Sequence, residues 1–209
     1  MISVLGIDPG HDGGAVLLAS DGCRSLAAWS WQRRKRKSGD VYLLTPTSGR
    51  EWEVGSLHYL ASHISGACST AIDYEAARVS DREEIYDLAV EGLFVWPGRT
   101  GGIIELAEAV GEIIGPLRPR ALSLSRCAPS EWRSAILPRG WGRSSDEAER
   151  AARQVAASTV RGLGPFVEYE IDGDGREVPI WPHVCEAVCI ARWGWVTARG
   201  AAQQSMVGR

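Results

Sequence analysis

The residues best suited to chemistry begin with Asp8, which ends a short apolar run in VLGIDPGHDGGAVLL, residues 4–18. A carboxylate at the end of a strand buried on both faces is costly to leave without a partner. Pro9 stops the strand, and the glycines after it allow tight turns and a close approach of backbone to a ligand. We therefore expect Asp8 either to cap the turn or to bind a cation, with room for a phosphate beside it.

A second acidic pair lies in STAIDYEAA, residues 69–77, whose pattern predicts a short strand over residues 69–76. In a strand, Asp73 and Glu75 point to the same face because side chains alternate. Two acids on one face of an inner strand indicate a bound cation, whereas an edge strand would expose them to water. The sequence leaves both interpretations open.

The third candidate lies in WPHVCEAVCIARWGW, residues 181–195, where His183 and Glu186 share one face of the first turn of a helix. The helix dipole alone favours an acid at this position, and a histidine at a helix start is often a cap or a surface residue. Combined with Asp8, however, the set suits divalent cations, because Mg²⁺ prefers a few carboxylates plus water and phosphate. Two such ions, roughly 4 Å apart, can activate water and stabilise a leaving oxygen in phosphodiester cleavage.

The elements that must position these groups alternate between strands and helices, which predicts an α/β fold, a mixed sheet with helices on its faces. A three-strand meander is expected over residues 1–31, and a final helix from Pro182 to about Ala198. Residues 80–98 fit either a helix over 81–93 or a mobile segment. The other expected elements are a basic link over 33–39, helices over 51–64 and 103–114, a strand over 120–127, a short helix in APSEWRSAIL (128–137), a helix capped by Ser144 and an acidic loop over 168–177.

Length and composition indicate one soluble globular domain, expected over residues 1–198 with a flexible tail over 199–209. No apolar run is long enough to cross a bilayer, and the start of the chain does not look like a signal peptide. The chain has five cysteines with no CxxC spacing, which predicts reduced, mostly buried thiols and a cytoplasmic location.

Basic residues are concentrated in two regions although the formal net charge is −3. Acids gathered at a metal site and bases along its flanks would still let the protein hold a phosphate backbone, whereas a basic run is also often a solvated loop. The first region is the run Arg33, Arg34, Lys35, Arg36 and Lys37, and the second contains Arg118, Arg120, Arg126, Arg133, Arg139 and Arg143.

Together these stretches resemble the RuvC-like Holliday-junction resolvases of the ribonuclease H-like superfamily. The matching pieces are VLGIDPGHDGGAVLL, TAIDYEAA, APSEWRSAIL and HVCEAVCIA, which occur in this order across about residues 3–195. The resemblance implies a ribonuclease H-like fold, a central mixed sheet with helices on both faces. It also implies a metal-dependent endonuclease of a bacterial or phage-infected cell.

The resemblance assigns roles to four residues. Asp8 would bridge two metal ions, and Glu75 would be the acid that closes the fourth strand, with Asp73 as its rival if the register shifts by two. Glu186 would be the second acid of the last helix, whereas His183 stands where the family usually has the first acid. A neutral imidazole lowers the negative charge of the site and shifts metal preference from Mg²⁺ toward Mn²⁺. The implied catalytic and metal-binding set is therefore Asp8, Glu75, His183 and Glu186, with two ions per site.

The implied activity is resolution of four-way junctions by paired symmetric nicks, which suits a twofold homodimer joined through the helix over 102–114. The residues expected to bind DNA are Arg33, Arg34, Lys35, Arg36, Lys37, Arg133, Arg139 and Arg143. Two alternatives keep the same fold: a junction-binding scaffold with a weak site, or a nuclease for other branched DNA. Actin-like and sugar-kinase ATPases also begin with a strand of this type followed by a glycine turn. They need, however, a second phosphate-binding glycine loop and a far longer chain.

Overall fold

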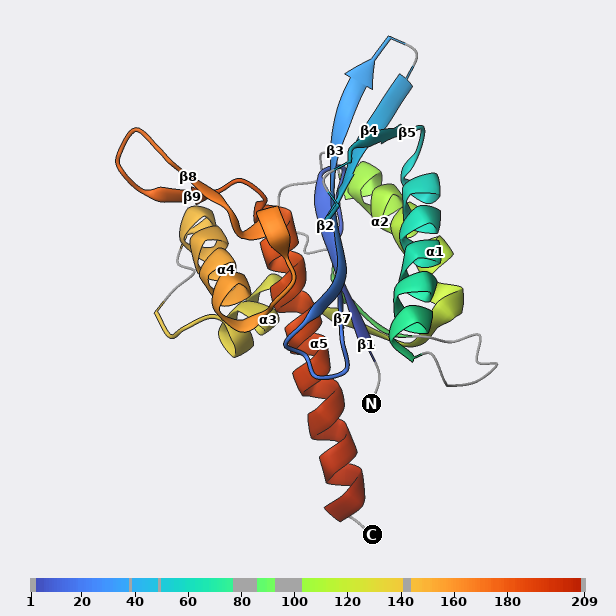
Figure 1. Ribbon diagram of the computed structural model, residues 1–209, viewed down its shortest axis with the longest axis vertical. Coiled ribbons are helices and arrows are strands. Elements are labelled where there is room, and N and C mark those ends of the chain that lie inside the picture. Colours follow the sequence, from blue (N-terminus) through green and yellow to red (C-terminus); the bar gives the residue numbers. More distant parts are fainter. Residues whose placement is uncertain are drawn as a thin grey trace.

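The computed structural model describes residues 3–37, 39–48, 50–76, 86–92, 103–140 and 144–207, without the side chains of 73–76 and 200–207. A seven-stranded mixed sheet of order β5-β4-β3-β2-β1-β6-β7 forms the centre, which confirms the expected α/β class (Figure 1). Its strands are β1 (Ser3–Asp8), β2 (Gly13–Leu18), β3 (Ser25–Arg36), β4 (Gly39–Pro46), β5 (Trp52–Val54), β6 (Tyr86–Glu91) and β7 (Ala121–Cys127). A separate hairpin contains β8 (Tyr169–Ile171) and β9 (Glu177–Pro179).

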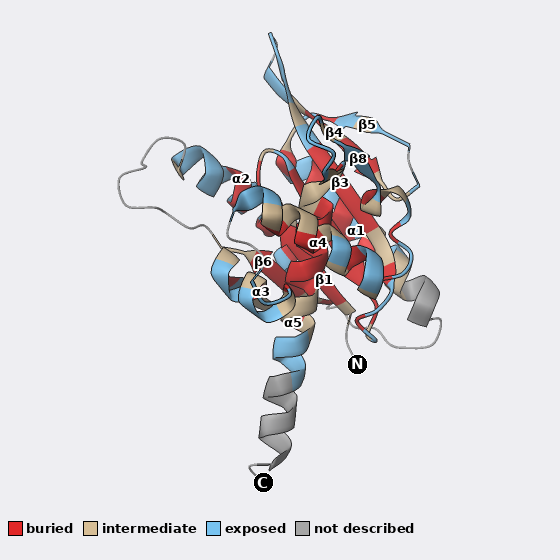
Figure 2. Ribbon diagram, turned by 90° about the vertical axis from the view of Figure 1, so that its left-hand side faces the viewer, coloured by how far each residue is buried: buried red, intermediate tan, exposed pale blue. Residues whose placement is uncertain are grey.

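Helices cover both faces of the sheet, and each face has its own apolar core. One face is covered by α1 (Leu57–Ala76) and α2 (Ile103–Leu117). The other is covered by α3 (Pro129–Ile136), α4 (Ser145–Thr159) and α5 (Pro182–Val207). Figure 2 shows the buried residues concentrated in the sheet and in the half of α5 that crosses it. Among the described helices, none combines the length and hydropathy needed to span a membrane.

Strand directions bring several strand ends to one edge of the sheet. β1 pairs antiparallel with β2 and parallel with β6, and β6 pairs parallel with β7. The register places Ile7 opposite Val90, so the next residues, Asp8 and Glu91, end neighbouring strands at the same edge. β3 runs in the direction of β1 because both are antiparallel to β2.

Two glycines let α5 pack closely against β1 and β2. A Cβ atom on Gly6 would lie 2.4 Å from the carbonyl oxygen of Ala187, and one on Gly14 would lie 2.5 Å from that of His183. Such contacts are far too short for carbon, so any side chain at either position would push the helix away. The glycines therefore fix the start of α5 beside the end of β1.

This packing corrects the expected role of the first glycine cluster. Gly13 and Gly14 lie within β2, where Cβ atoms would meet Trp31 and the backbone of α5 respectively. The space these glycines leave is therefore filled by protein, not by a phosphate.

The strand expected over residues 69–76 is wrong, because these residues complete α1. The apolar positions Leu57, Leu60 and Ile64 recur at helical spacing, and the buried Cys68 continues the series beyond the expected helix end. The expected helix over 51–64 consequently starts too early, since β5 occupies Trp52–Val54.

The ambiguous segment 80–98 contains β6 in its described part, so the expected helix is wrong there, and its remaining residues lie outside the described ranges. The expected basic link belongs to the β3–β4 hairpin, and the expected acidic loop forms the β8–β9 hairpin. α5 continues to Val207, beyond the expected end near Ala198. The strand before α3, the proline start of α3 and the Ser144 cap of α4 are confirmed.

Candidate metal centre

Acidic side chains from three elements converge at one edge of the sheet. Asp8 ends β1, Glu91 ends β6, and Glu186 lies in the first turns of α5 beside His183. Ligand atoms of Asp8, His183 and Glu186 all lie within 4.8 Å of one another. Asp8 is only 7% exposed and Glu186 only 9%, so the charges are held away from bulk water.

His183 contacts Asp8 directly. Its Nδ1 lies 2.7 Å from Oδ2 of Asp8, and this hydrogen bond is the main cause that raises the pKa of His183 to about 9. The imidazole is therefore protonated at neutral pH in the metal-free protein, where it partly neutralises Asp8. The expected pairing of His183 and Glu186 on one helix face is confirmed by this cluster.

The other two carboxyl groups carry raised pKa values. Burial raises the pKa of Glu186 and of Glu91 well above that of an exposed glutamate, and the charge of Asp8 raises both further. Arg133 opposes the effect, with its guanidinium 3.4 Å from Oε1 of Glu186. Three mutually repelling acids gain stability either from protons or from a divalent cation. Carboxylate oxygens with one imidazole are a donor set that fits Mg²⁺ or Mn²⁺.

Glu91 was not among the residues predicted from the sequence. The signal that could have found it is YDLAVEG, residues 86–92, an apolar run that ends in an acid and a glycine, as VLGIDPG does. The resemblance assigns this role to Glu75 as the acid that closes a strand, but the backbone of Asp73 and Glu75 belongs to α1. The acid that ends the strand beside β1 is Glu91.

α3 orients two of the acidic side chains. Trp132 is fully buried, and its indole N–H donates to Oε1 of Glu91 at 2.9 Å, while the next residue, Arg133, contacts Glu186. The start of the helix is fixed by Glu131, whose carboxylate accepts the backbone N–H of Ala128 at 2.6 Å. Partners of this kind hold metal-binding side chains in one orientation.

We expect Trp132→Phe to weaken the binding of Mg²⁺ or Mn²⁺ by roughly ten- to a hundredfold, the usual effect of losing such a partner. Phenylalanine keeps most of the buried ring but removes the N–H that holds Glu91. The concentration of Mg²⁺ or Mn²⁺ needed for half-maximal stabilisation should rise, which a titration of the metal against Tm measures.

Trp195→Phe is the matched control, because it removes an indole N–H bonded to the backbone oxygen of Ser20 at 3.1 Å. Similar metal titrations for the two variants would mean that Trp132 contributes only packing, and would contradict its role in holding Glu91.

The cluster predicts that the metal-free protein loses stability as the pH rises. Folding raises the pKa values of Glu91 and Glu186 above 4.5 and that of His183 from 6.5 to about 9. The folded protein therefore binds more protons than the unfolded chain within the window from 4.5 to about 9, so the free energy of unfolding contributed by the cluster falls across it. In EDTA, we expect Tm at pH 9 to lie at least ~5 °C below Tm at pH 6.

Mg²⁺ should raise Tm more at pH 9 than at pH 6, because metal and protons compete for the same groups. The Glu186→Gln variant controls for titration elsewhere, since it removes one of the repelling acids and should show a smaller fall. An equal fall in both proteins would contradict the assignment of the pH dependence to this cluster.

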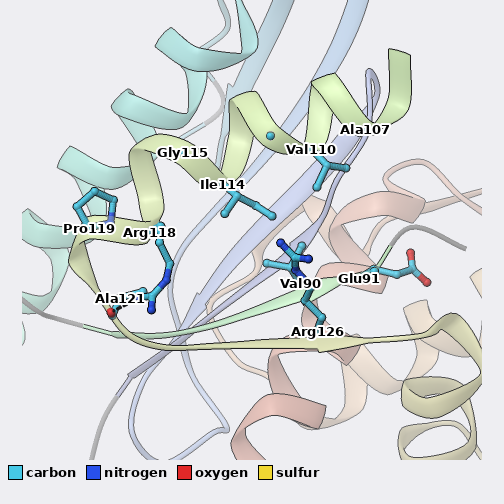
Figure 3. Close-up of a pocket in the computed structure, with 12 residues that line it drawn as sticks. Val90, Glu91, Ala107, Val110, Ile114, Gly115, Arg118, Pro119, Ala121 and Arg126 are labelled. Carbon is cyan, nitrogen blue, oxygen red and sulfur yellow. Dashed lines mark hydrogen bonds between the residues drawn. The ribbon is translucent and has the colours of Figure 1, made fainter. Parts of the chain in front are cut away.

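A groove leads away from Glu91 between α2 and the ends of β6 and β7. It has a volume of about 950 Å³, and α2 contributes an apolar wall that includes Val110 and Ile114. Figure 3 shows Glu91 at one end of the groove and the side chain of Arg126 pointing into its middle, with Arg118 at the far end. The groove therefore joins the acidic cluster to two cationic side chains.

The residues expected to bind DNA lie in different parts of the structure. The run from Arg33 to Lys37 is in the β3–β4 hairpin, Arg133 is at the acidic cluster, and Arg139 is exposed between α3 and α4. Arg143 lies outside the described residues. The cysteines are free thiols, and the expectation that most of them are buried is confirmed, since Cys23 alone among the five is exposed.

Comparisons with known proteins give no family model and no curated protein that matches this sequence. The structure is similar to that of RuvC from Thermus thermophilus, with a TM-score of 0.46 and 13% identity over 95% of this chain and 97% of that one. It is also similar to T. thermophilus RuvC in complex with Holliday junction substrate, with a TM-score of 0.40 and 15% identity over 96% and 97% of the two chains.

Proposed function

We propose that this protein is a metal-dependent, structure-selective DNA endonuclease that resolves Holliday junctions by paired symmetric nicks. The observation that carries the proposal is the meeting of Asp8, Glu91 and Glu186, from two parallel strands and a helix, at one edge of the sheet. Glu91 and Glu186 have strongly raised pKa values in the absence of metal, as expected for a site whose carboxylates bind a cation.

Asp8, Glu91 and Glu186 would hold two Mg²⁺ or Mn²⁺ ions, with His183 as a further ligand or as a partner that orients water. Bound metal supplies activation of a water molecule and stabilisation of the departing 3′-oxygen. Asp8 lies between the other groups, in contact with His183 and interacting with both Glu91 and Glu186. Arg133 contacts Glu186, and its side chain is partly exposed beside the cluster, so its guanidinium would place a positive charge next to a bound phosphate.

The DNA backbone would follow the cationic residues on either side of this cluster. Arg126 and Arg118 line the groove beside Glu91, and the β3–β4 hairpin carries the longer basic run. α2 would form the contact of a twofold homodimer, since its surface includes the apolar side chains of Ile104, which is 73% exposed, and Leu106. Two sites related by such an axis suit the two equivalent strands of a four-way junction.

The proposal is tested with an end-labelled synthetic four-way junction incubated with the protein in EDTA, Mg²⁺ or Mn²⁺. Paired symmetric nicks that require metal are the expected result. Tight junction binding without cleavage in either metal would instead favour a scaffold protein, and preferential cleavage of flaps or forks would favour a nuclease for other branched DNA.

A further inference from the structure

The β3–β4 hairpin extends beyond the edge of the sheet at which the acidic cluster lies. We call its outer part, residues 32–37 and 39–43, the wing; Figure 1 shows it projecting from the top of the molecule, and Figure 2 shows its outer end exposed. At the base of the wing, Tyr42 belongs to the apolar core and pairs with β5. The residues beyond it form a two-stranded projection that buries little apolar surface, so this outer part is not explained by the needs of the core.

The register of the sheet fixes how far the wing reaches past Asp8. Asp8 pairs with Gly14, and Gly14 pairs with Ser30, so these residues lie at one level across three strands. β3 then continues to Arg36, which at about 3.3 Å per residue carries the wing roughly 20 Å beyond Asp8.

The base of the wing is attached to the loop that follows Asp8. The backbone N–H of Arg33 donates to Oδ1 of Asp12 at 2.7 Å, and Nδ1 of His11 lies 3.2 Å from the hydroxyl of Tyr42. Two contacts from neighbouring loop residues to the two strands of the hairpin hold the base of the wing in a fixed position relative to the acidic cluster.

The basic residues of the wing divide between its two faces. Paired residues share a face and neighbours alternate, so Arg34 and Arg36 lie on the face that continues from Asp8, whereas Lys35 lies on the opposite face. Arg36 forms an ion pair with Glu53, and Arg33 lies 3.5 Å from Asp40. Arg34 is therefore the exposed cation of the wing that shares a face with Asp8 and has no acidic partner among the described residues.

We propose that the wing binds the backbone of the DNA arm that leads away from the cleaved phosphate, with Arg34 as the contact residue. This inference rests on the proposed function, since it takes branched DNA as the ligand. Arg34 lies four residues beyond Ser30, so a ligand that meets both the acidic cluster and Arg34 must carry negative charge roughly 13 Å from the metal-binding end, which a polyanion does. At about 3.4 Å per base pair, the contacted phosphate lies about 4 base pairs from the nick.

The test compares Arg34→Glu with Lys35→Glu, because the two changes alter net charge equally and differ in the face of the wing that they affect. Binding is measured by fluorescence anisotropy in EDTA, with junction arms of about 2 or about 12 base pairs beyond the nick position, lengths that end before or after Arg34. For the long arms, Arg34→Glu should weaken binding roughly tenfold and reduce the salt dependence by about one phosphate contact. Lys35→Glu should have less than a third of that effect, and neither change should affect the short arms beyond about twofold.

Equal losses for the two variants, or no dependence on arm length, would overturn the assignment to Arg34. Nicking of the short-armed junction in Mg²⁺, measured alongside, separates this inference from the proposed function. If the wild-type protein shows the arm dependence but never nicks, the assignment of Arg34 is supported and the proposed nuclease function is contradicted. If the wild-type protein nicks the junction but Arg34→Glu binds the long arms as wild type does, only the assignment of Arg34 is contradicted.

Discussion

Glu91→Gln is expected to lower the single-turnover rate of metal-dependent junction nicking by roughly a thousandfold. A metal ligand supplies several kcal/mol of transition-state stabilisation, and each 1.4 kcal/mol corresponds to about a tenfold change in rate. Glutamine has the same size as glutamate and can still accept the indole N–H of Trp132 through its amide oxygen, so the change removes the charge and little else. A time course on a labelled junction at saturating protein measures the effect.

Glu75→Gln is the informative comparison, because Glu75 is the acid that the sequence pattern assigns to the same role. We expect its nicking rate to stay within about twofold of wild type, because the backbone of Glu75 belongs to α1 and not to the strand end beside β1. The opposite result, a large loss from Glu75→Gln and a small one from Glu91→Gln, would mean that the metal ligand lies at the end of α1 and not at the end of β6. Thermal denaturation in EDTA at pH 8 guards against misfolding, since removal of a buried repelling charge should leave Tm of Glu91→Gln equal or higher.

The contrast between these two glutamates shows which parts of the site local sequence patterns can predict in this protein. β1 and the start of α5 were predicted because an apolar run that ends in an acid, and two polar residues three positions apart, are strong local patterns. STAIDYEAA also alternates locally, but its residues continue the buried face of α1 through Cys68. Packing of that face against the sheet makes the segment helical. A stretch of nine residues carries no information about this tertiary contact.

β6 shows the converse limit. Its six residues are too few to separate strand from helix by periodicity alone. Pairing with β1 on one side and β7 on the other makes it a strand, and both partners are distant in sequence. The hydrogen bond from Trp132 to Glu91 joins residues 41 positions apart, so the role of this tryptophan depends on the folded arrangement.

The wing depends on cross-strand pairing in the same way. Five consecutive basic residues predict a solvated link, because such side chains avoid burial. The segment nevertheless forms a strand, since β4 pairs with it along its length and two of the arginines meet acids from β4 and β5. The sequence therefore located the charge correctly but not the structure that carries it.

The largest loss is expected from Asp8→Asn, which should abolish metal-dependent nicking to below about a thousandth of the wild-type rate. Asp8 interacts with Glu91, His183 and Glu186 together, so its charge contributes to every part of the cluster. An asparagine can still accept a hydrogen bond from His183, which preserves the local packing. Without the negative charge, junction affinity in EDTA should be equal or higher, because one source of repulsion toward phosphate is removed.

Asp12→Asn provides the matched control within the same loop. Asp12 is exposed, and an amide oxygen at this position can still accept the backbone N–H of Arg33, so the loop keeps its attachment to the wing. We expect nicking by Asp12→Asn to stay within about threefold of wild type. Both variants remove one negative charge from positions four residues apart, so a large difference between them would depend on where the carboxylate lies and not on net charge. Equal rates for the two variants would instead mean that Asp8 is not a metal ligand, and the nuclease site would have to be sought elsewhere in the fold.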